Sequence, residues 1–247
     1  MNDLVAYTLA LGDDALVLSQ RLTEWCSHAP EIEEDIALAN IALDLLGQAR
    51  NFFAYAAELE GEGRSEDDLA YSRPEHAFRN VLLVEQENGD FAVTIVRQLL
   101  FSAYQRELYE QLAHSSDDTL AGIAGKAVKE VAYHCEHASE WTLRLGDGTD
   151  ESHRRAQAAL DRMWPFAHEL FAADPVASRL PGVAVEPSTL RVAWNQRVAP
   201  ILTAAILDRP GDHWRPSGGR AGRHTEAMGY LLAELQHLHR LHAGVSW

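Results

Sequence analysis

Acidic and histidine side chains in two stretches of the chain have the types and spacing that metal binding requires. Glu130, His134 and His137 follow one another at four- and three-residue steps, which places them on one side of a helix at about 100° per residue. A hydrogen-bond network along a helix would use the same spacing. One interpretation is a metal-binding oxidase, active in its own right through these three residues together with Asp44.

Asp44 lies in a polar stripe, because Asn40 and Gln48 stand one helical turn before and after it. The residues around the stripe are mostly apolar, and a carboxylate inside a buried helix must be ion-paired, hydrogen-bonded or bound to a metal. We expect Asp44 to be bonded to Arg50, Arg97 or a backbone donor rather than to a metal ion.

The stretch 31–61 that contains Asp44 predicts one long helix, buried on nearly all sides. Apolar residues recur along it at three- and four-residue steps: Ile32, Ile36, Ala39, Leu43, Leu46, Phe53 and Ala57. Other apolar residues fill the flanks, so such a helix needs neighbours on every side. We expect the rest of the chain to be organised around it.

Apolar periodicity predicts further helices and no strand in the rest of the chain. Long helices are expected at about 3–28, 91–114 and 118–145, and later helices at about 152–173, 188–208 and 225–242, with Pro165 and Pro200 as bends or boundaries. A polar link at 61–74, a short helix at 76–86 and an irregular segment at 175–187 join them.

These elements predict an all-α protein, with four long helices arranged as a ferritin-like antiparallel four-helix bundle and additional C-terminal helices outside it. We expect a single domain over 1–247, with the core bundle at about 3–146 and the outer helices at about 150–247. A chain of 247 residues is long enough to bury one large core.

Ferritin-like bundles that hold two metal ions use a Glu from each of two helices and a Glu-x-x-His pair from each of the other two. Three residues after Asp44 stands Gly47, and three residues after Glu130 stands Tyr133, so neither acid has the histidine that this pattern requires. The full ligand set is absent, and we predict no metal or other cofactor in this chain.

The net charge excludes some classes of partner. Lys and Arg number 21 against 37 Asp and Glu, so the formal charge is 21 − 37 = −16. A chain with this charge repels phosphate backbones and anionic lipid surfaces. We therefore expect no nucleic-acid partner and no membrane association.

The cysteines and the first residues indicate a cellular compartment. Cys26 and Cys135 fall within helical patterns without the spacing of a zinc or redox motif, so we expect buried free thiols in a reducing compartment. The first residues lack a basic start, and Asp13 and Asp14 interrupt the apolar run that follows. These features predict a cytoplasmic protein.

Four segments resemble the C subunits of the bacterial phenylacetyl-CoA epoxidases, the multicomponent ring 1,2-epoxidases of phenylacetate degradation. They are YTLALGDDALVLSQRLTEWCSHAPEIEEDIALANIALDLLGQARNF, LLVEQENGDFAVTIVRQ, KEVAYH and GGRAGRHTEAMGYLLAELQHLHR. The colinear match extends over essentially the whole chain.

The resemblance implies a ferritin-like, non-catalytic structural subunit. In this family the homologous A subunit holds the di-iron centre, binds the CoA thioester and activates O₂, and the C subunit pairs with it in a heterodimer that assembles further. The B and D subunits and a reductase with iron–sulfur, flavin and NADPH cofactors complete the system. Asp44 and Glu130 would then be remnants of ligand positions.

A structural role predicts a large apolar interface. We expect it on the helix at 3–28 and on the last helix, through Leu231, Leu235 and Leu238. The segment 209–223 combines the glycine-rich stretch 218–222 with four arginines: Arg209, Arg215, Arg220 and Arg223. We interpret it as a solvated flexible connector rather than a contact to CoA phosphates on the partner.

Overall fold

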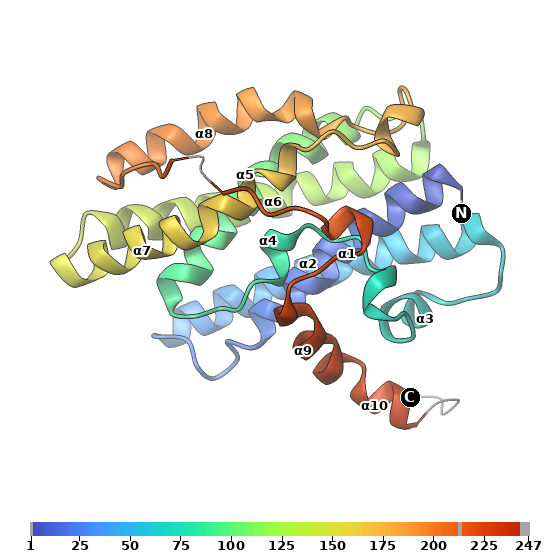
Figure 1. Ribbon diagram of the computed structural model, residues 1–247, viewed down its shortest axis with the longest axis horizontal. Coiled ribbons are helices and arrows are strands. Elements are labelled where there is room, and N and C mark those ends of the chain that lie inside the picture. Colours follow the sequence, from blue (N-terminus) through green and yellow to red (C-terminus); the bar gives the residue numbers. More distant parts are fainter. Residues whose placement is uncertain (1, 212–213, 243–247) are drawn as a thin grey trace.

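Helices and short connections make up the whole described chain, residues 2–211 and 214–242, in the computed structural model (Figure 1). No strand occurs in those two ranges, so the prediction of an all-α protein is confirmed. None of the helices described there is long and apolar enough to span a membrane.

Four long helices form two antiparallel pairs. They are α1 (Asp3–Thr23), α2 (Ile32–Glu60), α5 (Phe91–Leu112) and α6 (Asp118–Gly146). Short connections join α1 to α2 and α5 to α6, and within each pair the helices pack along one another, while α2 also packs against α6. Between the pairs the chain crosses back along the bundle, so that α2 and α5 run in the same direction (Figure 1).

The segment that crosses between the two pairs, residues 61–90, is called the crossing segment, and its structure differs from the prediction. The expected polar link at 61–74 contains a helix, α3 (Glu66–Tyr71), which begins at a capping box formed by Ser65 and Asp68. The expected helix at 76–86 is instead a 3-10 turn (Glu75–Ala77), an extended stretch and one short turn of helix, α4 (Leu82–Glu85). The stretch is extended because backbone N–H groups in it bond to carboxylates of α1 instead of to helical carbonyls.

The prediction that α2 is buried on nearly all sides is wrong. Along one side of α2, four large aliphatic side chains face solvent: Ile32, Ile36, Leu43 and Leu46, exposed by 72%, 58%, 62% and 42%. The helices buried on almost every side are α1 and α5. They take the organising role because α2 is packed mainly by α1 and α6 and leaves its outer side open.

Two later helices pack against the second pair. The first, α7 (Asp150–Ala167), lies on α5 and α6, and α8 (Arg191–Ala204) lies on the same two helices. Pro165 and Pro200 both fall in the last turns of these helices, so they mark helix ends more than bends in the middle. Between α7 and α8 are 3-10 turns at Glu169–Phe171, Ala177–Arg179 and Pro187–Leu190.

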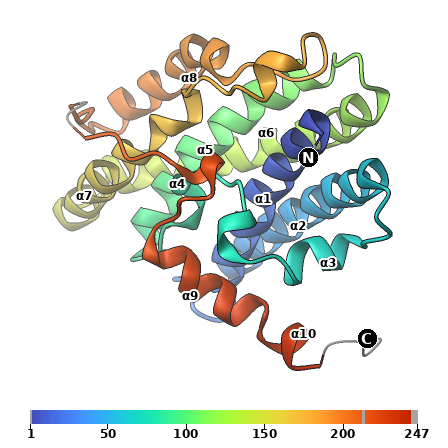
Figure 2. The ribbon, with the colours of Figure 1, turned by 45° about the vertical axis from the view of Figure 1, so that its right-hand side comes forward.

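The C-terminal segment extends away from the bundle (Figure 2). Instead of one helix it forms α9 (Glu226–Leu235) and α10 (His237–Leu241), which are separated at Gln236. The amide of Gln236 is buried and donates to the carbonyls of Ala70 and Arg73, which holds the break against the crossing segment. Despite this extension, one continuous hydrophobic core includes residues from Val5 to Leu232.

The two cysteines are free thiols, as predicted, but only one of them is buried. Cys135 lies inside the bundle, and burial raises the pKa of its thiol. Cys26 is exposed because α1 ends at Thr23, before the residues that were expected to continue it.

Candidate functional site

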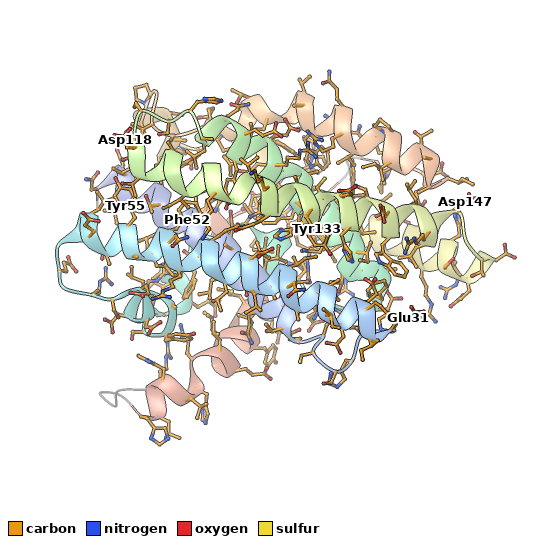
Figure 3. All side chains as sticks on the ribbon, turned by 180° about the vertical axis from the view of Figure 1, so that it is seen from behind. Glu31, Phe52, Tyr55, Asp118, Tyr133 and Asp147 are labelled. Atoms are coloured by element: carbon orange, nitrogen blue, oxygen red, sulfur yellow. The ribbon has the colours of Figure 1, made fainter. Side chains whose placement is uncertain are left out.

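The predicted site residues lie where α2 and α6 pack side by side, on the face seen in Figure 3. Three side-chain pairs bridge the two helices. Nε2 of His134 lies 3.0 Å from Oδ2 of Asp44, Nε2 of His137 lies 2.9 Å from Oε2 of Glu34, and Nε2 of Gln48 donates to Oε2 of Glu130 at 3.0 Å. The structure thus brings all four candidate residues to one helix contact, each with a partner on the opposite helix.

The prediction that Asp44 bonds to Arg50, Arg97 or a backbone donor is wrong, because its partner is His134. Arg50 pairs with Glu66 at 3.2 Å, and Arg97 is buried elsewhere, donating to the carbonyl of Gln86 and the side chain of Asn88. Asp44 is also not fully buried, since 37% of its side chain is exposed. Its position at the edge of α2 provides the solvation that a buried carboxylate would lack, so no arginine is required.

The positions that face the bundle interior are not those that the sequence suggested. Leu45 and Gln48 on α2 are buried at a three-residue spacing, and so are Val131 and His134 on α6. Gly47 and Tyr133, where histidines were sought, are exposed. The interior therefore has Leu45 and Val131 at the positions where a Glu-x-x-His pattern needs carboxylates.

The polar groups around Gln48 do not supply the missing oxygens. Tyr109 donates to Oε1 of Gln48 at 3.3 Å, and Nε2 of Gln105 donates to the Tyr109 hydroxyl at 3.4 Å. Burial raises the pKa of Tyr109, so its phenol stays neutral. Within the described residues, no three His, Cys, Asp or Glu side chains converge as metal ligands do. These residues do not fit a two-metal centre, which needs several anionic oxygens.

A second polar cluster, which the sequence did not predict, connects the C-terminal segment to α1. Asp14 is buried in α1, where it accepts two hydrogen bonds from Arg220 and one from the backbone of Val81. Burial raises the pKa of Asp14 to about 6, although the charge of Arg220 acts in the opposite direction. Arg220 also donates to the carbonyls of Ala10 and Arg79. The sequence signal for this site was an acidic pair inside the apolar run of α1.

Glu169 joins the same cluster from the end of α7. Its two oxygens accept from the backbone N–H groups of Leu82, Gly218 and Gly219 at 2.6–2.8 Å. Gly219 packs so closely on the backbone of Asn80 that a Cβ would collide with the Asn80 carbonyl. The segment 218–222 is therefore a fixed anchor, which corrects the expectation of a flexible connector.

The four arginines of 209–223 do not form one solvated cluster. Arg220 is held by Asp14, and the guanidinium of Arg209 lies 4.8 Å from the centre of the Trp164 ring. Arg215 and Arg223 are exposed. The interpretation of Arg220 as a solvated side chain is thus wrong, because it has a buried counter-ion on α1.

Glu85 binds the two residues that follow this anchor segment closely, His224 and Thr225. Its carboxylate is fully buried and accepts from Asn80, from the N–H and hydroxyl of Thr225, and from Nδ1 of His224 at 2.7 Å. Nε2 of His224 points at the carbonyl oxygen of Phe78, at 3.2 Å. Both ring nitrogens face acceptors, so this arrangement is satisfied best by a doubly protonated imidazolium.

We expect the free energy of unfolding to fall as pH rises above about 6.5, because of His224. Burial lowers the pKa of this histidine, but the hydrogen bond to Glu85 and its charge outweigh burial, so the pKa is raised overall. A raised pKa in the folded state gives a stabilisation that is complete below the unfolded pKa and is lost through the folded pKa. Urea unfolding at pH 6.5 and pH 9 measures the slope, and His224→Gln should flatten it; an equal slope in the variant would contradict this assignment.

The expected interface positions are mostly inside the molecule. Of the three predicted leucines, Leu231 is buried, Leu235 packs partly against the core, and Leu238 is exposed by 61%. The apolar residues of α1 are buried almost throughout. Four large exposed aliphatic side chains lie on α2, beside the three bridging pairs, and others lie on α8, on α10 and at Ile206.

This all-helical chain, with an apolar bundle interior and polar bridges between helices, belongs to the family described as phenylacetic acid catabolic protein, whose model it matches over residues 1–247. A relative from Escherichia coli K12, named as the C subunit of 1,2-phenylacetyl-CoA epoxidase, is 52% identical over 249 residues, and the match includes 100% of each chain. The resemblance seen in the sequence is therefore confirmed.

Proposed function

We propose that the chain is the non-catalytic structural subunit of a multicomponent di-iron oxygenase that epoxidises the aromatic ring of phenylacetyl-CoA in phenylacetate catabolism. One observation carries the proposal: Leu45 and Val131 occupy interior positions where a two-metal bundle needs carboxylates. The name and the identity of the E. coli relative support the assignment to this reaction.

The same proposal includes a single ferritin-like domain. Two antiparallel helix pairs joined by a long crossover are typical of ferritin-like folds. The continuous core from Val5 to Leu232 supports one domain. The interpretation of Asp44 and Glu130 as remnants of ligand positions does not fit this arrangement, because each stands one residue before an interior position and is bonded instead to His134 or Gln48.

The partners in this proposal are the homologous catalytic A subunit, the B and D subunits and a reductase, all in the cytoplasm. The A subunit would contribute the di-iron centre and the substrate site, and the reductase would contribute the iron–sulfur, flavin and NADPH chemistry. This chain would stabilise the A subunit, whose buried metal ligands weaken its packing, through a rigid apolar contact.

The alternative, an oxidase acting through Asp44, Glu130, His134 and His137, requires these side chains to converge on one ion. Each is instead held by a different neighbour: His134 by Asp44, His137 by Glu34, and Glu130 by Gln48. The geometry therefore favours the structural role.

Metal analysis of the purified chain separates the two candidates. After growth with excess iron we expect well below one iron per chain, and the same value for Asp44→Asn and His134→Gln, because these residues bond to each other. The co-expressed catalytic subunit is the positive control, with about two irons. About two irons in the isolated chain, lost in either variant, would contradict the structural role.

A further inference from the structure

A cavity of about 480 Å³ lies where the crossing segment packs against α1 and the end of α2. Its lining residues are Leu9, Glu60, Gly63, Arg64, Asp68, Ser72, Arg73, Pro74, Ala77 and Arg79. The volume falls within the range of about 300–1,000 Å³ that is typical of small-molecule sites. None of the residues that bridge α2 and α6 lines this cavity, and the proposed structural role does not use it.

Two of the three arginines at the cavity are neutralised by carboxylates. Nη2 of Arg64 lies 2.6 Å from Oε2 of Glu60. The buried Arg73 pairs with Asp13, and its guanidinium lies 4.2 Å from the centre of the Phe78 ring. Both charges are therefore compensated, and the guanidinium of Arg73 is also fixed in position.

Arg79 is the third arginine, and it has no carboxylate of its own. Its Nη1 donates to the carbonyls of His76 and Phe78, both at 2.7 Å, and its backbone N–H donates to Asp13 at 2.8 Å. In residues 2–211 and 214–242 no carboxylate forms an ion pair with its guanidinium. A guanidinium held in this way is prearranged for an anion, because its planar N–H groups match the two oxygens of a carboxylate.

The wall around Arg79 determines which anion fits. Most of the wall surface is apolar and suits a compact hydrocarbon body. Glu60 and Asp68 also border the cavity, so a ligand with two negative charges would be repelled. Asp68 stays ionised, because hydrogen bonds from Ser65 hold its pKa below the usual range. One negative charge on an apolar body is what an organic monocarboxylate has.

We propose that the cavity binds a small organic monocarboxylate, whose carboxylate pairs with Arg79 and whose apolar body lies against Leu9 and Ala77. The inference goes beyond the proposed function and does not depend on it. Aromatic and aliphatic acids share this chemistry, so the experiment uses one of each.

Calorimetry of the full chain tests the class of ligand. Phenylacetate, hexanoate or both should bind at one site with a dissociation constant below about 1 mM, which ligands of this size can reach. The neutral amide of the bound acid should bind at least about tenfold more weakly, and so should phenyl phosphate, which is mostly a dianion at about pH 7.5. Equal affinity for either compound would overturn the monocarboxylate, and so would the absence of binding by both acids at about 10 mM.

Substitutions at the cavity locate the site. Arg79→Gln removes the charge, and Ala77→Leu fills the cavity while keeping the arginine, so each should weaken binding at least about tenfold. Arg79→Lys keeps the charge and should bind more tightly than Arg79→Gln. Ala233→Leu is the matched control and should leave the dissociation constant unchanged, because Ala233 lines a neighbouring groove of about 550 Å³ between α9, α10 and Glu75. The melting temperature shows whether each variant is folded.

Each outcome decides a different point. Weaker binding by Ala77→Leu and Arg79→Gln, with Ala233→Leu unchanged, supports the site; if Arg79→Gln does not fold, the result for Ala77→Leu decides. Weaker binding by Ala233→Leu alone places the acid in the groove beside α9 and overturns the site. Unchanged binding in every variant overturns it as well. None of these outcomes bears on the structural role, which the metal analysis tests separately.

Discussion

Glu85→Ala is expected to lower the free energy of unfolding by about 3–5 kcal/mol, the cost of breaking a buried charged pair. The carboxylate accepts hydrogen bonds from three residues of two segments that are distant in sequence, Asn80, His224 and Thr225. Alanine would leave these donors buried without acceptors, and it would leave the charge of His224 uncompensated.

Urea unfolding followed by circular dichroism measures this loss. Because His224 would lose its partner, its pKa should fall, and the variant should lose most of the pH dependence expected above pH 6.5. Glu151→Ala is a suitable control, since that carboxylate is exposed and pairs only with arginines of its own helix. A loss no greater in Glu85→Ala than in the control would show that the anchor contributes little to stability.

Arg220→Ala is expected to have a comparable effect, about 3–5 kcal/mol at neutral pH, because it leaves Asp14 buried without its counter-ion. The pKa of Asp14, already raised to about 6, should rise further in the variant. At pH 5 the carboxyl would be protonated, so the loss of stability should be smaller there than at pH 8.

A second variant identifies Asp14 as the cause of that loss. Asp14→Asn combined with Arg220→Met removes both charges and keeps most of the volume, and it should recover much of the lost stability. Equal instability of the single and double variants at both pH values would indicate that Arg220 acts through its contacts with the carbonyls of Ala10 and Arg79 instead.

The helices were predictable because their signals are local. The four long helices are long runs rich in apolar residues and without strand or turn signals, and Asp90 and Asp117 mark two of the starts as side-chain caps. The crossing segment was not predictable, because its conformation depends on bonds from Arg79 and Val81 to carboxylates more than sixty residues earlier in the chain. Periodicity contains no information about such contacts.

The apolar pattern of α2 could not distinguish the positions that are buried in the core from those that are exposed. Ile36 and Leu43 have the residue types and spacing of core positions, yet both are exposed. A single sequence reports that a side chain avoids water and does not report which chain shields it.

The candidate site was partly predictable. The sequence indicated that Asp44, Glu130, His134 and His137 belong together, and the structure places them in one helix contact. It gave the wrong interior positions, because only the rotation of α2 and α6 in the bundle shows that Leu45 and Val131 face inward. The three carboxylates that hold the anchor segment 218–222 and the residues after it were missed: Asp14, Glu85 and Glu169. Partners of two of them, Arg220 and His224, lie far away in sequence.

In the proposed structural role this chain supports catalysis by another subunit and performs none itself. The most direct measurement is NADPH-dependent epoxidation of phenylacetyl-CoA by this chain alone, the catalytic subunit alone and the two co-purified, each with the remaining components. We predict turnover only for the co-purified pair, at a rate unchanged by Asp44→Asn. Turnover by this chain alone, or a catalytic subunit equally active and stable without it, would contradict the structural role.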